Sequence, residues 1–317
     1  MDISFVIPCY CSGENINRVI NDIDMVMQTE KLSYEIIMVN DGSPDETFSI
    51  IEEIAKRRSN TYAIDLARNG GQHVALMAGF NYAKGNIIVT CEDDGQTDIS
   101  ILPNLIQKLD EGYDVAAPRY LERGKRSLFR KCGTFFAQVM AKWMIPRPKG
   151  VIIPIFFAAK RFVIIETIKY NQPYPYIEGL ILRTTFNIAL VDSKQNNRIN
   201  GQSGYTIKKM LSLWLNGFTS FSIKPLRLSV ILGIITSFIG FVFGLIIVVN
   251  KIINPTILMG WTSIVAVILF MFGILFIILG LIGEYIGRIY LCINKTPQYI
   301  VRQVKSNEFE NKENLNE

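Results

Sequence analysis

The sequence is poor in histidine and lacks the common cysteine and glycine motifs. His73 is the only histidine among 317 residues. The five cysteines form no CxxC pair, and we interpret them as reduced packing residues rather than as a metal site or a disulfide framework. No GxGxxG or Walker segment follows a predicted strand. A bound nucleotide would therefore need a partner other than a glycine-rich loop for its phosphates.

The sequence also has no strong excess of charge of one sign. Its formal net charge is +5, which is too small to make nucleic acid the expected partner. The basic residues instead crowd into segments 119–149 and 198–227. Anionic lipid headgroups or phosphorylated ligands fit that pattern better.

Two long segments lack charge altogether. Residues 228–250 and 252–283 contain no charged side chain over 23 and 32 positions, which is long enough to cross the hydrocarbon of a bilayer. A buried helix of a soluble protein is the alternative, but both segments are apolar on every face. Lysines and arginines flank the pair on its outer sides, whereas the connection holds only Lys251. The positive-inside rule therefore predicts a multi-pass protein of the inner (plasma) membrane, with the N-terminal domain in the cytoplasm.

Strand-like and helix-like segments alternate from residue 3 onward. Apolar β-rich runs at 3–10, 34–40, 61–67 and 86–91 are separated by segments with helical spacing of their apolar residues. This alternation predicts an α/β fold with a mostly parallel sheet and crossover helices on both faces. Such sheets bind ligands at the carboxyl ends of their strands, which is where the polar clusters fall.

Three consecutive carboxylates, Glu92, Asp93 and Asp94, follow the fourth predicted strand in the stretch CEDDGQTD. Adjacent like charges raise one another's energy unless a cation or hydrogen-bond donors offset them. The stretch therefore predicts either a metal site or a well-solvated turn. If a metal binds, hard oxygen ligands favour Mg²⁺ or Mn²⁺.

Four segments occur in an order typical of one enzyme family. They read VIPCYCSGENI, IIMVNDGSPDET, LARNGGQHVALMAGFNYAKGNIIVTCEDDGQ and GLIGEYIGRIYL. Together they resemble family 2 glycosyltransferases of the GT-A fold, specifically the membrane-anchored polyisoprenyl-phosphate glycosyltransferases related to dolichol-phosphate mannose synthase. We accordingly expect a GT-A (Rossmann-like) domain over 1–205, amphipathic interfacial helices over 206–226, a transmembrane hairpin over 227–290 and a cytoplasmic tail over 291–317.

The resemblance also implies a reaction. Its members transfer one monosaccharide, with inversion, from a nucleotide-sugar to a polyprenyl (undecaprenyl) phosphate on the cytoplasmic membrane face. UDP is the expected nucleotide by family frequency, and the product would serve surface polysaccharide or cell-envelope glycosylation. Relatives form tetramers, which makes a homo-oligomer compatible with the resemblance.

Donor and metal residues carry over position by position. Glu92 and Asp94 stand at the two acidic metal positions, and Gln96 stands at the glutamine that can complete the shell; Asp93 is expected to face the ribose or solvent. The donor-binding residues that the resemblance implies are Pro8, Tyr10, Glu14, Asp41, Asn69, Asp93, Arg198 and Ser203. For Asp41 an Asx-turn into the following helix is the structural alternative.

The acceptor side depends on arginines. With Asp94, the implied catalytic groups are Arg119, Arg126 and Arg130, which we expect to bind the acceptor phosphate. A solvated basic face is the alternative for each of them.

One family feature is absent. Many relatives carry an aspartate followed by Phe-Arg, often proposed as the catalytic base, where this chain has Ile155 and Phe156. A phosphate acceptor is largely a dianion at cytoplasmic pH and needs little activation. We interpret His73 as a structural or donor-shaping residue, because a protonated imidazole is disfavoured at a helix N-terminus.

Two other functions stay open. A catalytically silent membrane scaffold with the same fold would explain Glu92 in place of aspartate and the missing base. A polysaccharide synthase would need more spans and a Gln-x-x-Arg-Trp segment, neither of which the sequence contains.

Overall fold

The computed structural model describes residues 1–13, 15–95, 97–120, 148, 150–193, 224–253, 260–294 and 296–307. The chain forms two compact units. Unit 1 comprises Met1–Met210 with Thr296–Glu317, and unit 2 comprises Leu211–Lys295. Residues 206–223 of the predicted interfacial helices lie outside the described part of the chain.

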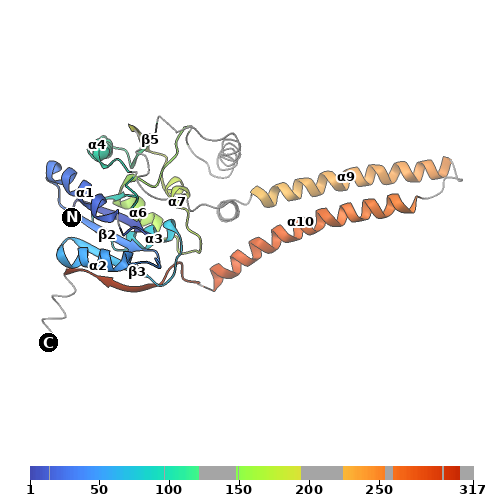
Figure 1. Ribbon diagram of the computed structural model, residues 1–317. Coiled ribbons are helices and arrows are strands. Elements are labelled where there is room, and N and C mark those ends of the chain that lie inside the picture. Colours follow the sequence, from blue (N-terminus) through green and yellow to red (C-terminus); the bar gives the residue numbers. More distant parts are fainter. Residues whose placement is uncertain are drawn as a thin grey trace. The chain divides into compact units, whose positions relative to one another are not determined.

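Unit 1 is built on a sheet in which the described residues form eight strands (Figure 1). The four strands β3, β2, β1 and β4 lie side by side and are mutually parallel, which confirms the predicted α/β arrangement. The strands are β1 (Ile3–Cys9), β2 (Tyr34–Asn40), β3 (Thr61–Leu66), β4 (Ile87–Thr90), β5 (Val115–Tyr120), β6 (Phe157–Lys160), β7 (Ile188–Ser193) and β8 (Val301–Lys305), in the spatial order β7-β5-β6-β4-β1-β2-β3-β8.

Helices cover both faces of this sheet, as Figure 1 shows. Each of the first three connects one parallel strand to the next in the chain. The described helices of unit 1 are α1 (Ile16–Glu30), α2 (Thr47–Arg57), α3 (Gln72–Phe80), α4 (Leu102–Asp110), α6 (Arg161–Ile168) and α7 (Ile177–Thr184), with a short 3₁₀ helix, η1 (Ile99–Ile101).

The central strand β1 is buried on both faces. Ile3, Phe5 and Ile7 belong to the apolar core that also contains the buried faces of α1, α2 and α4. The alternate residues face α3, which packs so closely that a Cβ atom on Gly79 would lie 2.4 Å from Cγ1 of Val6. A helix can approach the strand this closely because position 79 has no side chain.

Two antiparallel strands differ from the simple alternation that the sequence predicts. β6 is inserted between β4 and β5 and is antiparallel to both, which leaves β5 parallel to β4. β8 lies in the segment 291–317, which the sequence analysis assigns to a tail, and it pairs antiparallel with β3 at the sheet edge. Covering that edge removes a row of unpaired backbone groups.

Unit 2 consists of two long helices, α9 (Lys224–Ile253) and α10 (Trp261–Ile293). Their segments Ser229–Ile246 and Phe270–Ile293 have mean hydropathies of 2.4 and 2.1, so both are long and apolar enough to cross a membrane. Large apolar side chains stand exposed on them, such as Phe238 at 68% and Ile277 at 73%. The second helix begins later and ends later than the uncharged segment 252–283.

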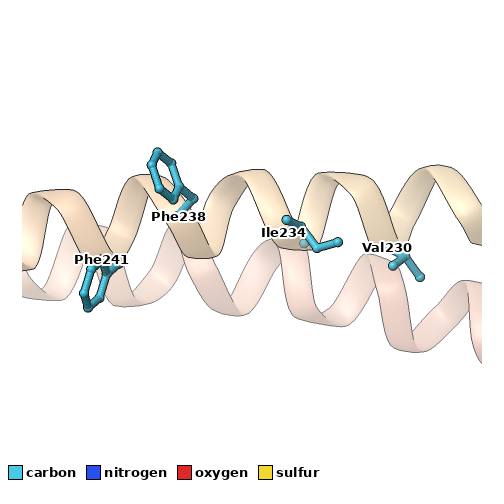
Figure 2. Close-up of a pocket in the computed structure, with 5 residues that line it drawn as sticks. Val230, Ile234, Phe238 and Phe241 are labelled. Atoms are coloured by element: carbon cyan, nitrogen blue, oxygen red, sulfur yellow. The ribbon is translucent and has the colours of Figure 1, made fainter.

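A shallow hollow lies on the surface of α9. Figure 2 shows the apolar residues Val230, Ile234, Phe238 and Phe241 that line it, with α10 running behind. Its described lining residues carry no polar side chain, and in a bilayer such a surface is covered by acyl chains. We assign it no binding role.

A buried polar cluster lies near the amino ends of β1, β2 and β4. The Ser4 hydroxyl donates to Oε1 of Glu35 at 2.6 Å and accepts from the Gly85 N–H at 2.7 Å, and both Ser4 and Glu35 are fully buried. Lys84 N–H donates to the same carboxylate oxygen at 2.6 Å. This cluster ties β1, β2 and the turn before β4 together.

Ser4→Ala should therefore destabilise unit 1. The substitution leaves the buried Gly85 N–H without its acceptor and removes a donor from the buried Glu35 carboxylate. The free energy of unfolding should fall by about 1–3 kcal/mol. Thermal melts of the detergent-solubilised full chain would measure the loss, with Thr29→Ala on the exposed face of α1 as the matched control. Equal midpoints for the two variants would contradict the role of the cluster.

Candidate active site

The candidate site lies at the carboxyl ends of the parallel strands. β1, β2, β3 and β4 end at Cys9, Asn40, Leu66 and Thr90, and the loops that follow them meet at one edge of the sheet. Two carboxylates, Asp41 and Asp93, join these four loops in pairs.

Asp41 joins the loop after β2 to the loop after β3. Its carboxylate is 3% exposed and accepts the Gly70 N–H at 2.7 Å and the Gly71 N–H at 2.8 Å. Burial raises the pKa of Asp41, and the two N–H donors partly oppose that rise. Among the described residues Asp41 accepts no N–H of an Asx-turn into α2; the neighbouring Asn40 accepts the Ser43 N–H at 3.2 Å.

Gly42 allows these two loops to touch. It has a left-handed φ of +60°, and a Cβ atom there would lie 2.7 Å from the backbone of Arg68 and Asn69. Asn69 itself is exposed beside this contact, where the sequence predicts a donor-binding residue.

Asp93 joins the loop after β1 to the loop after β4. Its carboxylate accepts the Tyr10 N–H at 3.0 Å and also the Ser12 hydroxyl. Burial raises the pKa of Asp93, the two donors lower it, and the charge of Asp94 raises it further. One of its two oxygens, Oδ2, is thus bonded within the protein, and the expectation that the side chain faces the ribose or solvent stays a prediction.

Two predicted donor-binding residues at the end of β1 differ in their exposure. Pro8 is buried within β1, opposite Val39 of β2, whereas the Tyr10 side chain is 50% exposed. The structure thus leaves Tyr10 as the more accessible of these two predicted donor contacts. Ser12, which the sequence analysis did not single out, carries the link to Asp93.

The acidic loop is folded back on itself. The Glu92 N–H donates to Oγ1 of the buried Thr97 at 3.3 Å, and Glu92 and Asp94 are half-buried on either side of Asp93. Within the described residues, no group of three or more His, Cys, Asp and Glu side chains is arranged as a metal cage. Two carboxylates still fit Mg²⁺ or Mn²⁺, because such ions often take one or two carboxylates and complete their shell with water and substrate phosphate.

Tyr120 is a site residue that the sequence analysis missed. It ends β5, and its pKa is raised to about 12 by burial and by the charges of Glu92, Asp98 and Asp94. The hydroxyl therefore stays protonated beside the acidic loop and can donate a hydrogen bond. The signal that could have found it is the run DVAAP that precedes it, because the strand β5 that forms there is parallel to β4.

Arg119, the neighbouring residue, is engaged in an ion pair. Its Nε lies 2.5 Å from Oδ1 of Asp192, which it faces in the β5 and β7 register, and both side chains are about half exposed. The sequence predicts that Arg119 binds the acceptor phosphate. In this structure it joins two strands.

His73 occupies the second position of α3 and packs edge-on against Tyr176, with ring centroids 5.4 Å apart. Burial lowers its pKa to about 4, so the ring is neutral at cellular pH. Its Nδ1 is buried and has no hydrogen-bond partner in the described part of the chain. The Tyr176 hydroxyl in turn donates to Glu178 at 2.5 Å, which places a carboxylate at the start of α7 near this pair.

The segment without the expected acid lies next to β4. Thr90 Oγ1 donates to the Ile155 carbonyl, and Phe156 is 1% exposed in the core. The position where many relatives carry an aspartate is held by Ile155, which is half-buried and has no acidic group. The remaining predicted site residues lie outside the described ranges: Glu14, Gln96, Arg126, Arg130, Arg198 and Ser203.

Solved structures with a similar fold include an enzyme with a bound metal and donor. Glucosyl-3-phosphoglycerate synthase from Mycobacterium tuberculosis, in complex with Mn²⁺, UDP-glucose and phosphoglyceric acid, aligns with a TM-score of 0.50 over 68% of this chain and 76% of its own, at 19% identity. At that identity the likeness shows the fold, which is GT-A as the sequence predicts.

Curated relatives align over nearly the whole chain. An uncharacterized glycosyltransferase, YkcC, of Bacillus subtilis is 35% identical over 98% of this chain and 95% of its own. The undecaprenyl-phosphate 4-deoxy-4-formamido-L-arabinose transferase of Klebsiella pneumoniae is 32% identical over 95% and 93%. The prophage bactoprenol glucosyl transferase homolog of Escherichia coli is 30% identical over 96% and 100%.

The family itself is shown by a direct match. Residues 4–168 match the model of "Glycosyl transferase family 2", a range that runs from the second residue of β1 through β4 and the acidic loop. This agrees with the resemblance drawn from the four sequence segments. The chain belongs to glycosyl transferase family 2.

Proposed function

We propose that this chain transfers a monosaccharide from a nucleotide-sugar to a polyprenyl phosphate at the cytoplasmic face of the plasma membrane, with inversion at the anomeric carbon. The observation that carries the proposal is the acidic loop after β4, which Asp93 holds to the loop after β1, in a chain that also carries two membrane-length apolar helices. The acidic loop suits a hydrophilic nucleotide-sugar donor, and the apolar helices suit a lipid acceptor.

The relatives support the proposed class of acceptor more strongly than the identity of the donor sugar. Two of them are named for transfer to undecaprenyl phosphate or bactoprenol, yet their sugars differ. The acceptor class is thus shared among similar chains, whereas the sugar varies. We propose a UDP-sugar donor, supported by a fold neighbour that binds UDP-glucose.

The donor is expected to bind along the joined loops. Asp41 fixes the loop that would face the base, and Tyr10 stands exposed next to it. Glu92 and Asp94 would hold Mg²⁺ or Mn²⁺, whose positive charge would offset the charge of the donor diphosphate. The protonated Tyr120 hydroxyl can donate to a diphosphate oxygen at the same edge.

The acceptor is expected to act as its own nucleophile. An oxygen of the phosphate dianion attacks the anomeric carbon, the bond from that carbon to the diphosphate oxygen breaks, and the nucleoside diphosphate leaves with the electron pair. A phosphate with a second pKa near 6 loses its last proton before it binds, so no side chain needs to remove one. The absence of an acid at Ile155 and Phe156 is compatible with this chemistry.

Transfer assays would test the proposal. Radiolabelled sugar from UDP-, GDP- and dTDP-sugars should appear in undecaprenyl phosphate in detergent with Mn²⁺ and should be lost with EDTA. Asp94→Asn should lower the rate by roughly two orders of magnitude, the size typical of removing a charge-stabilising group. Asp110→Asn, at the exposed end of α4, is the matched control and should leave the rate unchanged.

Two outcomes would contradict the proposal. Full activity of Asp94→Asn would remove the acidic loop from the mechanism. Absence of product from every donor, together with absence of nucleotide binding by calorimetry, would favour the catalytically silent scaffold.

His73 gives a prediction about pH. If the acceptor dianion is the nucleophile, the rate should rise with pH through about 6, the second pKa of a phosphate monoester. Because the His73 pKa is about 4, His73→Gln should keep the same midpoint in the pH profile. A midpoint that disappears in His73→Gln would instead identify the imidazole as the titrating group.

The same residue should affect acid stability. Its folded-state pKa of about 4 lies below the ordinary value of 6.5, so the stability it contributes is present above pH 6.5 and is lost as the pH falls toward 4. Between pH 7.5 and pH 5 the wild type should lose about 1–2 kcal/mol more than His73→Gln. Thermal melts at both pH values would measure this, and parallel losses would contradict it.

A further inference from the structure

We propose that Arg302 of β8 is a positioning residue for the donor site, acting through Asp65 and Asn40 on the loop that follows β2. The inference deepens the proposed function, because it assigns part of donor binding to a chain segment that follows the second membrane-length helix. No side chain of β8 needs to touch the donor for this effect.

The first contact joins β8 to a buried charge. Nη1 of Arg302 lies 3.0 Å from Oδ2 of Asp65, whose side chain is 2% exposed. The pairing of β3 with β8 shifts register here: Leu66 faces Val301 and Asp65 faces Gln303, so Arg302 is the extra residue of a bulge. Bulges often redirect a side chain. This bulge directs the Arg302 guanidinium to the Asp65 carboxylate.

The second contact links Asp65 to Asn40 at the end of β2. The Asn40 amide donates from Nδ2 to Oδ1 of Asp65 at 2.7 Å, which fixes the orientation of the amide. Its oxygen therefore points the other way and accepts the Ser43 N–H at 3.2 Å. The turn that contains Asp41 and Gly42 is closed by this bond.

The constraint reaches two further loops. Oγ of Ser43 accepts the Cys11 N–H at 3.2 Å, in the loop that carries Tyr10. On the other side, Ile300 accepts the Ala67 N–H at 2.9 Å, and Nη2 of Arg302 donates to the Ala67 carbonyl at 3.2 Å. Ala67 precedes by three and four residues Gly70 and Gly71, whose amides hold Asp41.

Charge explains why the loss of Arg302 should matter. A buried carboxylate that loses its cationic partner keeps most of its desolvation cost and seeks water or a new donor. Movement of Asp65 would release the Asn40 amide, and with it the turn at residues 40–43. The expected consequence is a looser donor site with the chemical groups unchanged.

The first arm of the test needs no ligand. Hydrogen exchange of the detergent-solubilised full chain would compare wild type, Arg302→Gln and Lys305→Gln. Lys305 is the matched control: it lies on the same strand, 3.9 Å from Glu52, which also pairs with Lys56 at 2.9 Å. Exchange in the peptide covering residues 40–47 should increase in Arg302→Gln and stay at the wild-type level in Lys305→Gln.

The second arm measures donor affinity. In Arg302→Gln the Kd of UDP with Mn²⁺ and the KM for the donor sugar should rise about tenfold, the size typical of partners that orient a binding group, with kcat unchanged. Arg302→Lys should recover most of this loss, because it restores the charge beside Asp65.

The outcomes are separable from those of the proposed function. Unchanged exchange at residues 40–47 in Arg302→Gln would overturn the inference, as would a lower melting temperature with an unchanged Kd for UDP. If the wild type binds no nucleotide, the proposed function fails, and the exchange arm still decides whether Arg302 orders the loop.

Discussion

The arrangement of the site depends on two carboxylates, Asp41 and Asp93, that are turned inward to bind backbone N–H groups. Each links two loops that follow different parallel strands, and together they unite the loops after β1, β2, β3 and β4. Burial raises the pKa of both, which shows that the fold holds them at an electrostatic cost. The donors at Gly70, Gly71 and Tyr10 offset part of that cost and thereby determine the loop positions.

This constraint gives Asp41 and Asp93 a structural role at the sheet edge. With Asp93 turned inward, Glu92 and Asp94 stand on either side of it at the sheet edge, and the nearby Tyr120 responds to their charge. The loop can thus hold several negative charges close together and keep its conformation, because its central residue, Asp93, is bonded to the rest of the protein. A divalent cation is the natural counterpart of such a loop, since hard carboxylate oxygens and substrate phosphates together satisfy it.

Much of the architecture could be predicted from the sequence. The mostly parallel sheet with crossover helices follows from the alternation of apolar runs, and the two membrane-length helices follow from uncharged stretches. The antiparallel strands β6 and β8 could not be predicted in the same way. β8 reads VRQVK, a short polar segment whose pairing with β3 depends on residues more than 200 positions away. Local patterns carry no information about such a partner.

The candidate site shows the same division. The sequence identified the residue types at the sheet edge, including the acidic triplet and Asp41. It did not indicate which acid of the triplet turns inward, because adjacent carboxylates look alike until their neighbours in space are known. The contacts of Asp93 with Ser12 and of Asp65 with Arg302 join distant segments, and Arg119 proved to be paired with Asp192.

The central claim is that the acidic loop holds a divalent ion together with the donor diphosphate. Anomalous diffraction from the full chain crystallised with UDP and Mn²⁺ would test it most directly. The account predicts one manganese peak that is bonded to the Asp94 carboxylate and to UDP oxygens. UDP bound at this edge without manganese at residues 92–96, or manganese bound elsewhere, would contradict it.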